Sequence, residues 1–304
     1  MIELVQIFII AIAQGVTEFL PISSSGHNAV INHLFMLTGH PLTEDSAEFI
    51  KLNILLHIGS LIAILVIFRQ RIINLLGKDR RLIPMLIVAT IPAVAVGLSI
   101  HKLAPWLEDC LHLISGCFIV TGIMLLFTMR TSEGEKTCST MTWTDVLIIG
   151  FAQAIAILPG ISRSGMTIVT GLLCRLKREE AAAFSFLLAI PVIGGSGLLA
   201  CRDMMKEVQP GASPISDKFL ILGALISCVA GIIALVFLLN WLKKGKLWYF
   251  AVWVFLMAPF TFVLAILPMP EKNAPPQVSA AVQSVEEQQN EGTPHGVAFP
   301  EKIE

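Results

Sequence analysis

Long apolar segments limit what this chain can fold into. A helix needs about 20 mostly apolar residues to cross a bilayer. The composition is 55% hydrophobic and only 14% charged, with a mean hydropathy of +0.78, which excludes a soluble globular protein. A net charge of −1 also argues against a nucleic-acid binder or a disordered chain. We therefore expect an all-α polytopic membrane protein with six transmembrane helices at residues 50–68, 82–100, 113–130, 181–200, 219–242 and 247–267.

Two further apolar regions, 2–40 and 145–175, are each interrupted by a turn rich in serine and glycine. The half-segments beside each turn are close to the shortest length that crosses a bilayer. Each region is therefore predicted to form a re-entrant helix pair with its turn at membrane depth, where irregular backbone must be buried or line a wet cavity. The turns read Leu20-Pro21-Ile22-Ser23-Ser24-Ser25-Gly26 and Leu158-Pro159-Gly160-Ile161-Ser162-Arg163-Ser164-Gly165.

The two broken regions repeat one pattern at a constant offset of 139 residues. Three predicted spans follow each copy, so an odd number of crossings brings the second copy in from the opposite face. This arrangement predicts an inverted-topology repeat, with a first repeat at 1–130 and a second at 145–267. The recurring pairs are Gln14 and Gln153, Ile22 and Ile161, Ser23 and Ser162, Ser25 and Ser164, and Gly26 and Gly165.

Charge in the loops predicts the topology. Loops 69–81, 175–178 and 243–246 are basic and should be cytoplasmic by the positive-inside rule. The net acidic stretches 40–51 and 101–112 should lie on the other side, which places both termini outside. Loop 131–144 is too weakly charged to assign. The polar tail, 268–304, is predicted to be disordered. No basic leader precedes the first apolar run, so we expect no cleaved signal peptide.

Two charged side chains fall inside the broken segments. Arg163 is the one residue among 21 Lys and Arg that no loop or tail accounts for, and Glu18 is its acidic counterpart. A charge within the bilayer costs a few kcal/mol, so it marks a candidate functional site. The simpler alternative is an ion pair that only ties the two repeats together. The surrounding serines and glycines favour a ligand, because hydroxyls and backbone N–H groups at helix starts bind phosphate oxygens, as does an arginine fork.

The positions at which the copies differ indicate a division of labour. The first copy carries a carboxylate, a hydroxyl and an imidazole, which can supply a nucleophile and acid or base groups, and the second carries the anion-binding arginine. Two mechanisms remain open: Ser24 attacks phosphorus with His27 as base, or His27 attacks while Glu18 orients its ring. The differing pairs are Glu18 and Ile157, Ser24 and Arg163, and His27 and Met166.

The two turns resemble the signatures of a known family. The segment from Gln14 to His27 is similar to the first signature of the bacterial undecaprenyl-diphosphate phosphatases of the BacA type, and the segment from Pro159 to Thr167 to the second. The likeness extends over about residues 1–267. It implies interlocked inverted repeats in the bacterial cytoplasmic membrane. It also implies hydrolysis of undecaprenyl diphosphate to the carrier lipid used in cell-wall synthesis, at a site open to the external face.

The resemblance also implies roles for single residues. Glu18, Ser24, His27 and Arg163 become the catalytic candidates, and Glu18 the candidate ligand of a divalent cation, Mg²⁺ or Ca²⁺. The chain departs from the family at His57, where glutamine is usual, in the extra tail, and at Trp253-Val254, where Tyr-Arg is common. The candidate substrate-binding residues are Gln14, Ser23, Ser25, Gly26, Ser162, Ser164, Gly165 and Thr167.

The expected partners are a prenyl diphosphate lipid, the bilayer and a second copy of the chain as a candidate homodimer, with no nucleic acid. A different class remains open, because inverted repeats with broken helices and buried charges are also typical of secondary transporters. The alternative function is thus a transporter or lipid flippase for a phosphorylated substrate. Release of inorganic phosphate by the purified protein distinguishes the two classes.

Overall fold

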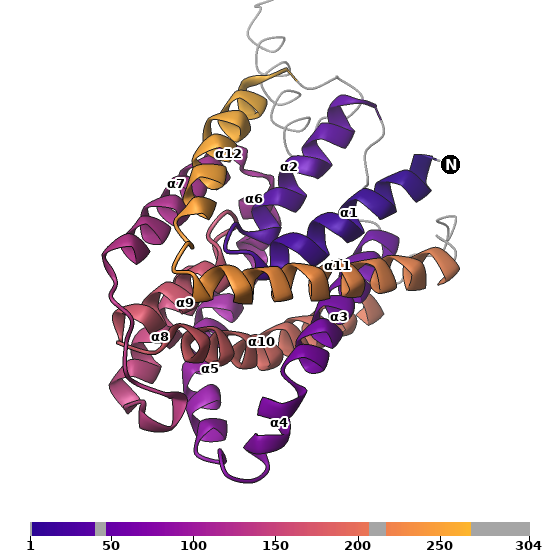
Figure 1. Ribbon diagram of the computed structural model, residues 1–304. Helices are drawn as coiled ribbons and strands as arrows, with labels where there is room; N and C mark the ends of the chain where they lie inside the picture. Colours follow the sequence, from indigo (N-terminus) through magenta and orange to yellow (C-terminus); the bar gives the residue numbers. More distant parts are fainter. Residues whose placement is uncertain (1, 40–46, 207–216, 269–304) are drawn as a thin grey trace, which may run out of the picture.

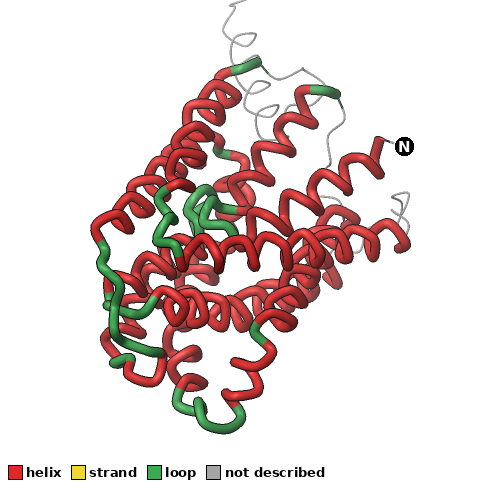
Figure 2. The backbone as a smooth tube through the Cα atoms, viewed as in Figure 1, coloured by secondary structure: helices red, strands yellow, loops and turns green. Residues whose placement is uncertain are grey.

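The computed structural model describes residues 2–39, 47–206 and 217–268 as a set of helices joined by loops (Figures 1 and 2). Within these ranges no strand forms, and a single bridge pairs Lys136 with Leu176. Most of the acidic stretch 40–51 and nearly all of the tail 268–304 lie outside the described residues, so the prediction of a disordered tail stays a prediction.

Six helices are long and apolar enough to cross a membrane, which confirms the predicted class of protein. Exposed apolar side chains recur every three or four residues along them, at Ile83, Ile87 and Ile91 for example. Such a stripe on a helix faces lipid. A 3₁₀ turn, Phe127–Arg130, extends the third span to its predicted end. The six are α3 (Ala47–Ile67), α5 (Leu82–Ile100), α7 (Leu111–Leu126), α10 (Arg178–Lys206), α11 (Asp217–Lys243) and α12 (Tyr249–Ile266).

The two broken regions form the expected helix pairs, α1 (Ile2–Phe19) with α2 (Ser24–Leu37) and α8 (Trp143–Ile155) with α9 (Arg163–Leu173). The repeated serine and glycine explain where the second helix of each pair begins. Ser23 caps α2 by accepting from the N–H of Gly26, and Ser162 caps α9 by accepting from the N–H of Gly165. The 11 residues of α9 extend about 17 Å, well short of the roughly 30 Å of a hydrocarbon core.

The helices of the two repeats pack in an exchanged pattern. Helix α1 packs on α11, whereas its counterpart α8 packs on α5, which is the counterpart of α11. Small residues permit both approaches, since Gly15 lies against α11 at Ser227 and Gly150 against α5 at Ala89. The first helix of each pair therefore packs on a span from the other half of the chain, as interlocked repeats would require. The repeat boundaries and their opposite orientation stay predictions.

The three basic loops gather at one end of the molecule. The short helix α4 (Arg69–Leu75) and loop 131–144, which charge alone left unassigned, lie at the same end. The start of α1 and the end of α12 lie away from α4, as does a second short helix, α6 (Ala104–Asp109) (Figure 1). The contacts that join the basic end are the Arg71–Glu180 ion pair, Arg178 to the Lys243 carbonyl (3.3 Å) and Arg81 to the Ser139 carbonyl (3.0 Å).

Candidate active site

The turns of the two helix pairs contact each other directly. The N–H of Gly160 donates to Ser23 Oγ at 3.1 Å, and Ser164 Oγ donates to the carbonyl of Leu20 at 3.2 Å. A side chain at Gly26 would come within 2.9 Å of the Gly160 Cα, so glycine is needed for this approach. Residues predicted from two separate motifs therefore form one site between the repeats.

Ser23 has an unusual backbone conformation. Its φ of 73° and ψ of 105° lie in a region that residues other than glycine rarely adopt. Its counterpart Ser162 has a φ of −73°, so the strain belongs to the first copy alone. Such strain costs about 1–3 kcal/mol and tends to occur at functional sites. In this conformation the Ser23 hydroxyl accepts from two N–H groups, those of Gly26 and Gly160.

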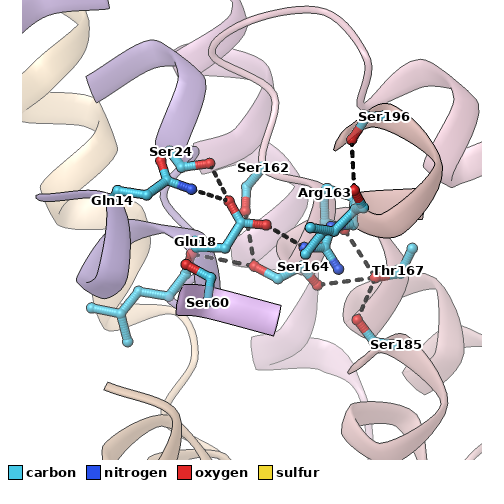
Figure 3. A network of polar contacts seen from close by, with 12 residues as sticks. Gln14, Glu18, Ser24, Ser60, Ser162, Arg163, Ser164, Thr167, Ser185 and Ser196 are labelled. Carbon is cyan, nitrogen blue, oxygen red and sulfur yellow. Dashed lines mark hydrogen bonds and ion pairs between the residues drawn. The ribbon is translucent and has the colours of Figure 1, made fainter. Parts of the chain in front are cut away.

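Glu18 is the centre of the polar network (Figure 3). Its side chain accepts from Gln14 Nε2 at 3.2 Å, from Ser24 Oγ at 2.7 Å and from Arg163 Nη2 at 2.5 Å. The residue is only 9% exposed, so its charge needs the guanidinium beside it. The two intramembrane charges found in the sequence are therefore an ion pair, and the candidate nucleophile Ser24 shares the same carboxylate.

A cavity of about 260 Å³ opens beside this network. Its polar wall contains Glu18, Ser24, Ser25 and Arg163, and its apolar wall comes from α5, from α10 and from residues 156–161, which follow α8. A second cavity of about 130 Å³ shares Ser24 and Ser25 and continues toward Glu108 at the end of α6. The two serines therefore lie between a chamber lined by the ion pair and a passage that leads away from the basic end.

His27 lies in a different environment from the one predicted. Its Nδ1 bonds to the carbonyl of Ser23 at 2.7 Å, and its Nε2 accepts from the indole N–H of Trp253 at 2.9 Å. Both ring nitrogens are therefore engaged, with the proton on Nδ1. Neither printed partner of the ring is Ser24 or Glu18, and the group that bonds to Ser24 is Glu18. The catalytic role of His27 stays a prediction.

The other predicted substrate-binding residues divide into two groups. Ser23, Ser25 and Ser162 line the larger cavity, and Gln14 lines the smaller one. The rest are not among the residues that line these two cavities, and they build the second turn or the contact between the turns. These are Gly26, Ser164, Gly165 and Thr167, of which Thr167 Oγ1 donates to the Arg163 carbonyl at 2.9 Å and lies 2.6 Å from Ser185 Oγ.

The described residues do not form a metal cage on their own. Nowhere in the described ranges do three His, Cys, Asp or Glu side chains gather closely enough to hold an ion. Glu18 is the one carboxylate on the wall of the larger cavity, and both of its oxygens already accept from protein donors. A divalent cation at this site would therefore need most of its ligands from elsewhere.

Two residues at the site were missed in the sequence. Gln153 lines the larger cavity, although only its repeat counterpart Gln14 was selected. The 139-residue repeat was the signal that pointed to it. Trp253, noted only as a departure from a family pattern, turns out to hold His27. No local pattern links those two residues, which are 226 positions apart.

These features define a multi-pass membrane protein that is helical through its described residues, with a buried site between the helices that suits an anionic group. The family model described as bacitracin resistance protein BacA matches residues 7–260, and the chain belongs to that family. The undecaprenyl-diphosphatase of Rhodopirellula baltica is 42% identical over 251 residues, covering 83% of this chain and 94% of that protein. That of Thermodesulfovibrio yellowstonii is 37% identical over 265 residues (84% and 97%), and undecaprenyl-diphosphatase 4 of Bacillus thuringiensis 40% over 248 (81% and 92%).

Proposed function

We propose that this protein is an undecaprenyl-diphosphatase. It hydrolyses undecaprenyl diphosphate to undecaprenyl phosphate and inorganic phosphate, and so recycles the carrier lipid for cell-wall synthesis. The observation that carries the proposal is the Ser24 hydroxyl bonded to Glu18 beside Arg163, within a cavity between membrane helices. Family membership and the names of the relatives give the substrate.

The geometry favours Ser24 as the nucleophile and Glu18 as its base. Ser24 Oγ attacks the terminal phosphorus while its proton passes to the carboxylate 2.7 Å away. The bond from that phosphorus to the bridging oxygen breaks, and its electron pair leaves with the lipid phosphate. Water then attacks the phosphoserine, releasing inorganic phosphate and restoring the hydroxyl. Arg163 and the start of α9 stabilise the charge on the transferred group.

A divalent cation, Mg²⁺ or Ca²⁺, is proposed to enter with the diphosphate. Hard cations of this kind are often held by one or two carboxylates together with substrate phosphates and water. Glu18 is the carboxylate that would contact it from the protein. The ion would neutralise part of the diphosphate charge.

We place the protein in the bacterial cytoplasmic membrane with its site open to the external face and both termini outside. In support, the smaller cavity runs from the serines toward Glu108 of α6. Helix α6 lies on the side of the molecule away from α4 (Figure 1). A homodimer is proposed as the simplest symmetric assembly, and cross-linking in intact membranes tests it.

The decisive experiment measures release of inorganic phosphate from long- and short-chain prenyl diphosphates by purified protein, with and without a chelator. Stoichiometric release that depends on the cation is expected. A transporter or lipid flippase, the alternative from the sequence, would move a phosphorylated substrate across proteoliposomes without releasing phosphate.

A further inference from the structure

The repeat-related glutamines Gln14 and Gln153 occupy contrasting environments. Gln14 uses both ends of its amide, because Nε2 donates to Glu18 at 3.2 Å and Oε1 accepts from Asn28 Nδ2 at 2.8 Å. Gln153, on α8, is 1% exposed, yet neither its Nε2 nor its Oε1 has a partner. A buried amide without hydrogen bonds costs free energy and requires an explanation.

The position of Gln153 indicates which kind of hydrogen-bond partner its amide lacks. It lines the larger cavity together with Ser24 and Arg163. Arg163 has a second unsatisfied donor there, since Nη2 binds Glu18 while Nη1 is buried without a partner. Two buried donors from α8 and α9 therefore lie on the wall of the chamber that also contains the candidate nucleophile.

The partner that fits two unsatisfied donors is an oxygen-rich anion. Hydrogen bonds to a charged acceptor are roughly twice as strong as those between neutral groups, so a phosphoryl oxygen suits both positions. A neutral amide also adds a donor without adding a second positive charge, which would compete with Arg163 for Glu18.

We propose that Gln153 is a substrate-binding residue that donates from Nε2 to a phosphoryl oxygen of the bound diphosphate, beside Arg163 Nη1. This inference rests on the proposed function, because it names a further contact for the same substrate. The second repeat would then bind the diphosphate through Gln153 as well as through Arg163.

The test compares Gln153→Leu with Gln14→Leu. Leucine removes the amide at similar size, so Gln153→Leu should raise KM for undecaprenyl diphosphate roughly tenfold to hundredfold. It should leave the Tm of the ligand-free protein unchanged or higher, because no hydrogen bond is lost. Gln14→Leu should lower that Tm, because Glu18 and Asn28 each lose a partner. Gln70→Leu, on the exposed face of α4, is the neutral control for the same substitution.

A second readout separates this inference from the proposed function. Inorganic pyrophosphate should raise the Tm of the wild-type protein, and Gln153→Leu should lose most of that shift. An unchanged KM and an unchanged pyrophosphate shift in Gln153→Leu overturn the inference while leaving the function standing. So does a ligand-free Tm that falls as far as in Gln14→Leu, which would make Gln153 a structural residue. If the wild-type protein releases no phosphate, the function fails, and the pyrophosphate shift alone decides the role of Gln153.

Discussion

Arg163 can hold Glu18 in an ion pair and still offer a donor to a ligand. Arg163 uses one nitrogen, Nη2, to hold Glu18 and leaves Nη1 directed at no protein acceptor. The pair therefore stabilises two buried charges when no ligand is bound, and a diphosphate can be recognised without breaking it. A residue that only tied the repeats together would have both nitrogens satisfied, as buried guanidinium groups usually are.

Replacing Arg163 with lysine should remove most activity while the protein still folds. An ammonium can approach Glu18, but it cannot contact the carboxylate and a phosphoryl oxygen with two fixed donors. The loss of one positioned donor costs about 2.7–4 kcal/mol, or roughly 10²–10³ in kcat. Phosphate release and Tm are measured beside Arg175→Lys, an exposed arginine bonded to Ser132. Activity within a few-fold of wild type would make Arg163 a structural partner only.

Ser24→Ala should reduce kcat more than His27→Ala. Ser24 Oγ is bonded to Glu18, whereas the ring of His27 is bonded to Ser23 and Trp253. Loss of the nucleophile costs on the order of 10³-fold or more. His27→Ala should instead show a lower Tm, because two hydrogen bonds and a ring contact with Phe118 are lost.

Two results would contradict the prediction for Ser24 and His27. A Ser24→Ala enzyme that keeps a tenth of its activity shows that the hydroxyl is not the nucleophile. An acid-labile, base-stable phosphoenzyme trapped at His27 assigns the attack to histidine, which then requires the Trp253 bond to open. Glu18→Gln tests the proposed role of Glu18 as the base, because glutamine keeps the size of the side chain but removes the carboxylate that accepts the proton.

The sequence identified Glu18, Ser24 and Arg163 because a charge or a serine-rich turn is conspicuous in an apolar segment. It left the partners of His27 open between Ser24 and Glu18, because spacing along one helix does not show which way a ring faces. The contact that decides its orientation comes from Trp253 on α12. Gln153 was missed because its importance lies in having no hydrogen-bond partner, which only the folded structure can show.

At the scale of helices, prediction and structure agree because the length of an apolar segment indicates where a membrane-spanning helix begins and ends. The span predicted at 82–100 is α5, Leu82–Ile100, and that at 219–242 is α11, Asp217–Lys243. The short helices α4 and α6 were not predicted, because seven and six residues carry too little periodicity. The exchange of partners between α1 and α8 was expected only in outline, since the small residues that permit it, such as Gly15, also occur in helices that do not pack this way.

Gly26→Ala should destabilise the contact between the two turns. An added Cβ would lie 2.8 Å from the Phe118 ring and 2.9 Å from the Gly160 Cα, and the latter is backbone that cannot rotate away. Overpacking of this kind costs about 1–3 kcal/mol. We expect a lower Tm together with reduced kcat, since the turns position Ser24 and Arg163. Gly116→Ala, at an open position on α7, is the matched control and should leave both unchanged. An unaltered Tm in Gly26→Ala would show that the turns can separate freely.

At the scale of the whole molecule, three kinds of observation bear on orientation. The basic loops gather at one end, the start of α1 and the end of α12 lie away from α4 (Figure 1), and six helices can cross the membrane. An even number of crossings returns the chain to its starting side, and the positive-inside rule predicts that the basic end is cytoplasmic. Loop 131–144 lies at that end and should be cytoplasmic as well, although its own charge does not show it.

A two-point experiment tests this orientation. A phosphatase reporter fused after Glu304 should be active, because that enzyme folds only outside the cytoplasm, and a fluorescent protein fused there should be dark. In a background without the six native cysteines, Glu135→Cys should react with a membrane-impermeant maleimide only after the cells are broken. Both results are required. With an odd number of crossings, loop 131–144 could still be cytoplasmic, but the tail would not lie on the external side. Labelling of Glu135→Cys in intact cells would show that the orientation is the reverse of the one proposed. The passage toward Glu108 would then open on the cytoplasmic side, where hydrolysis would act on a different pool of carrier lipid.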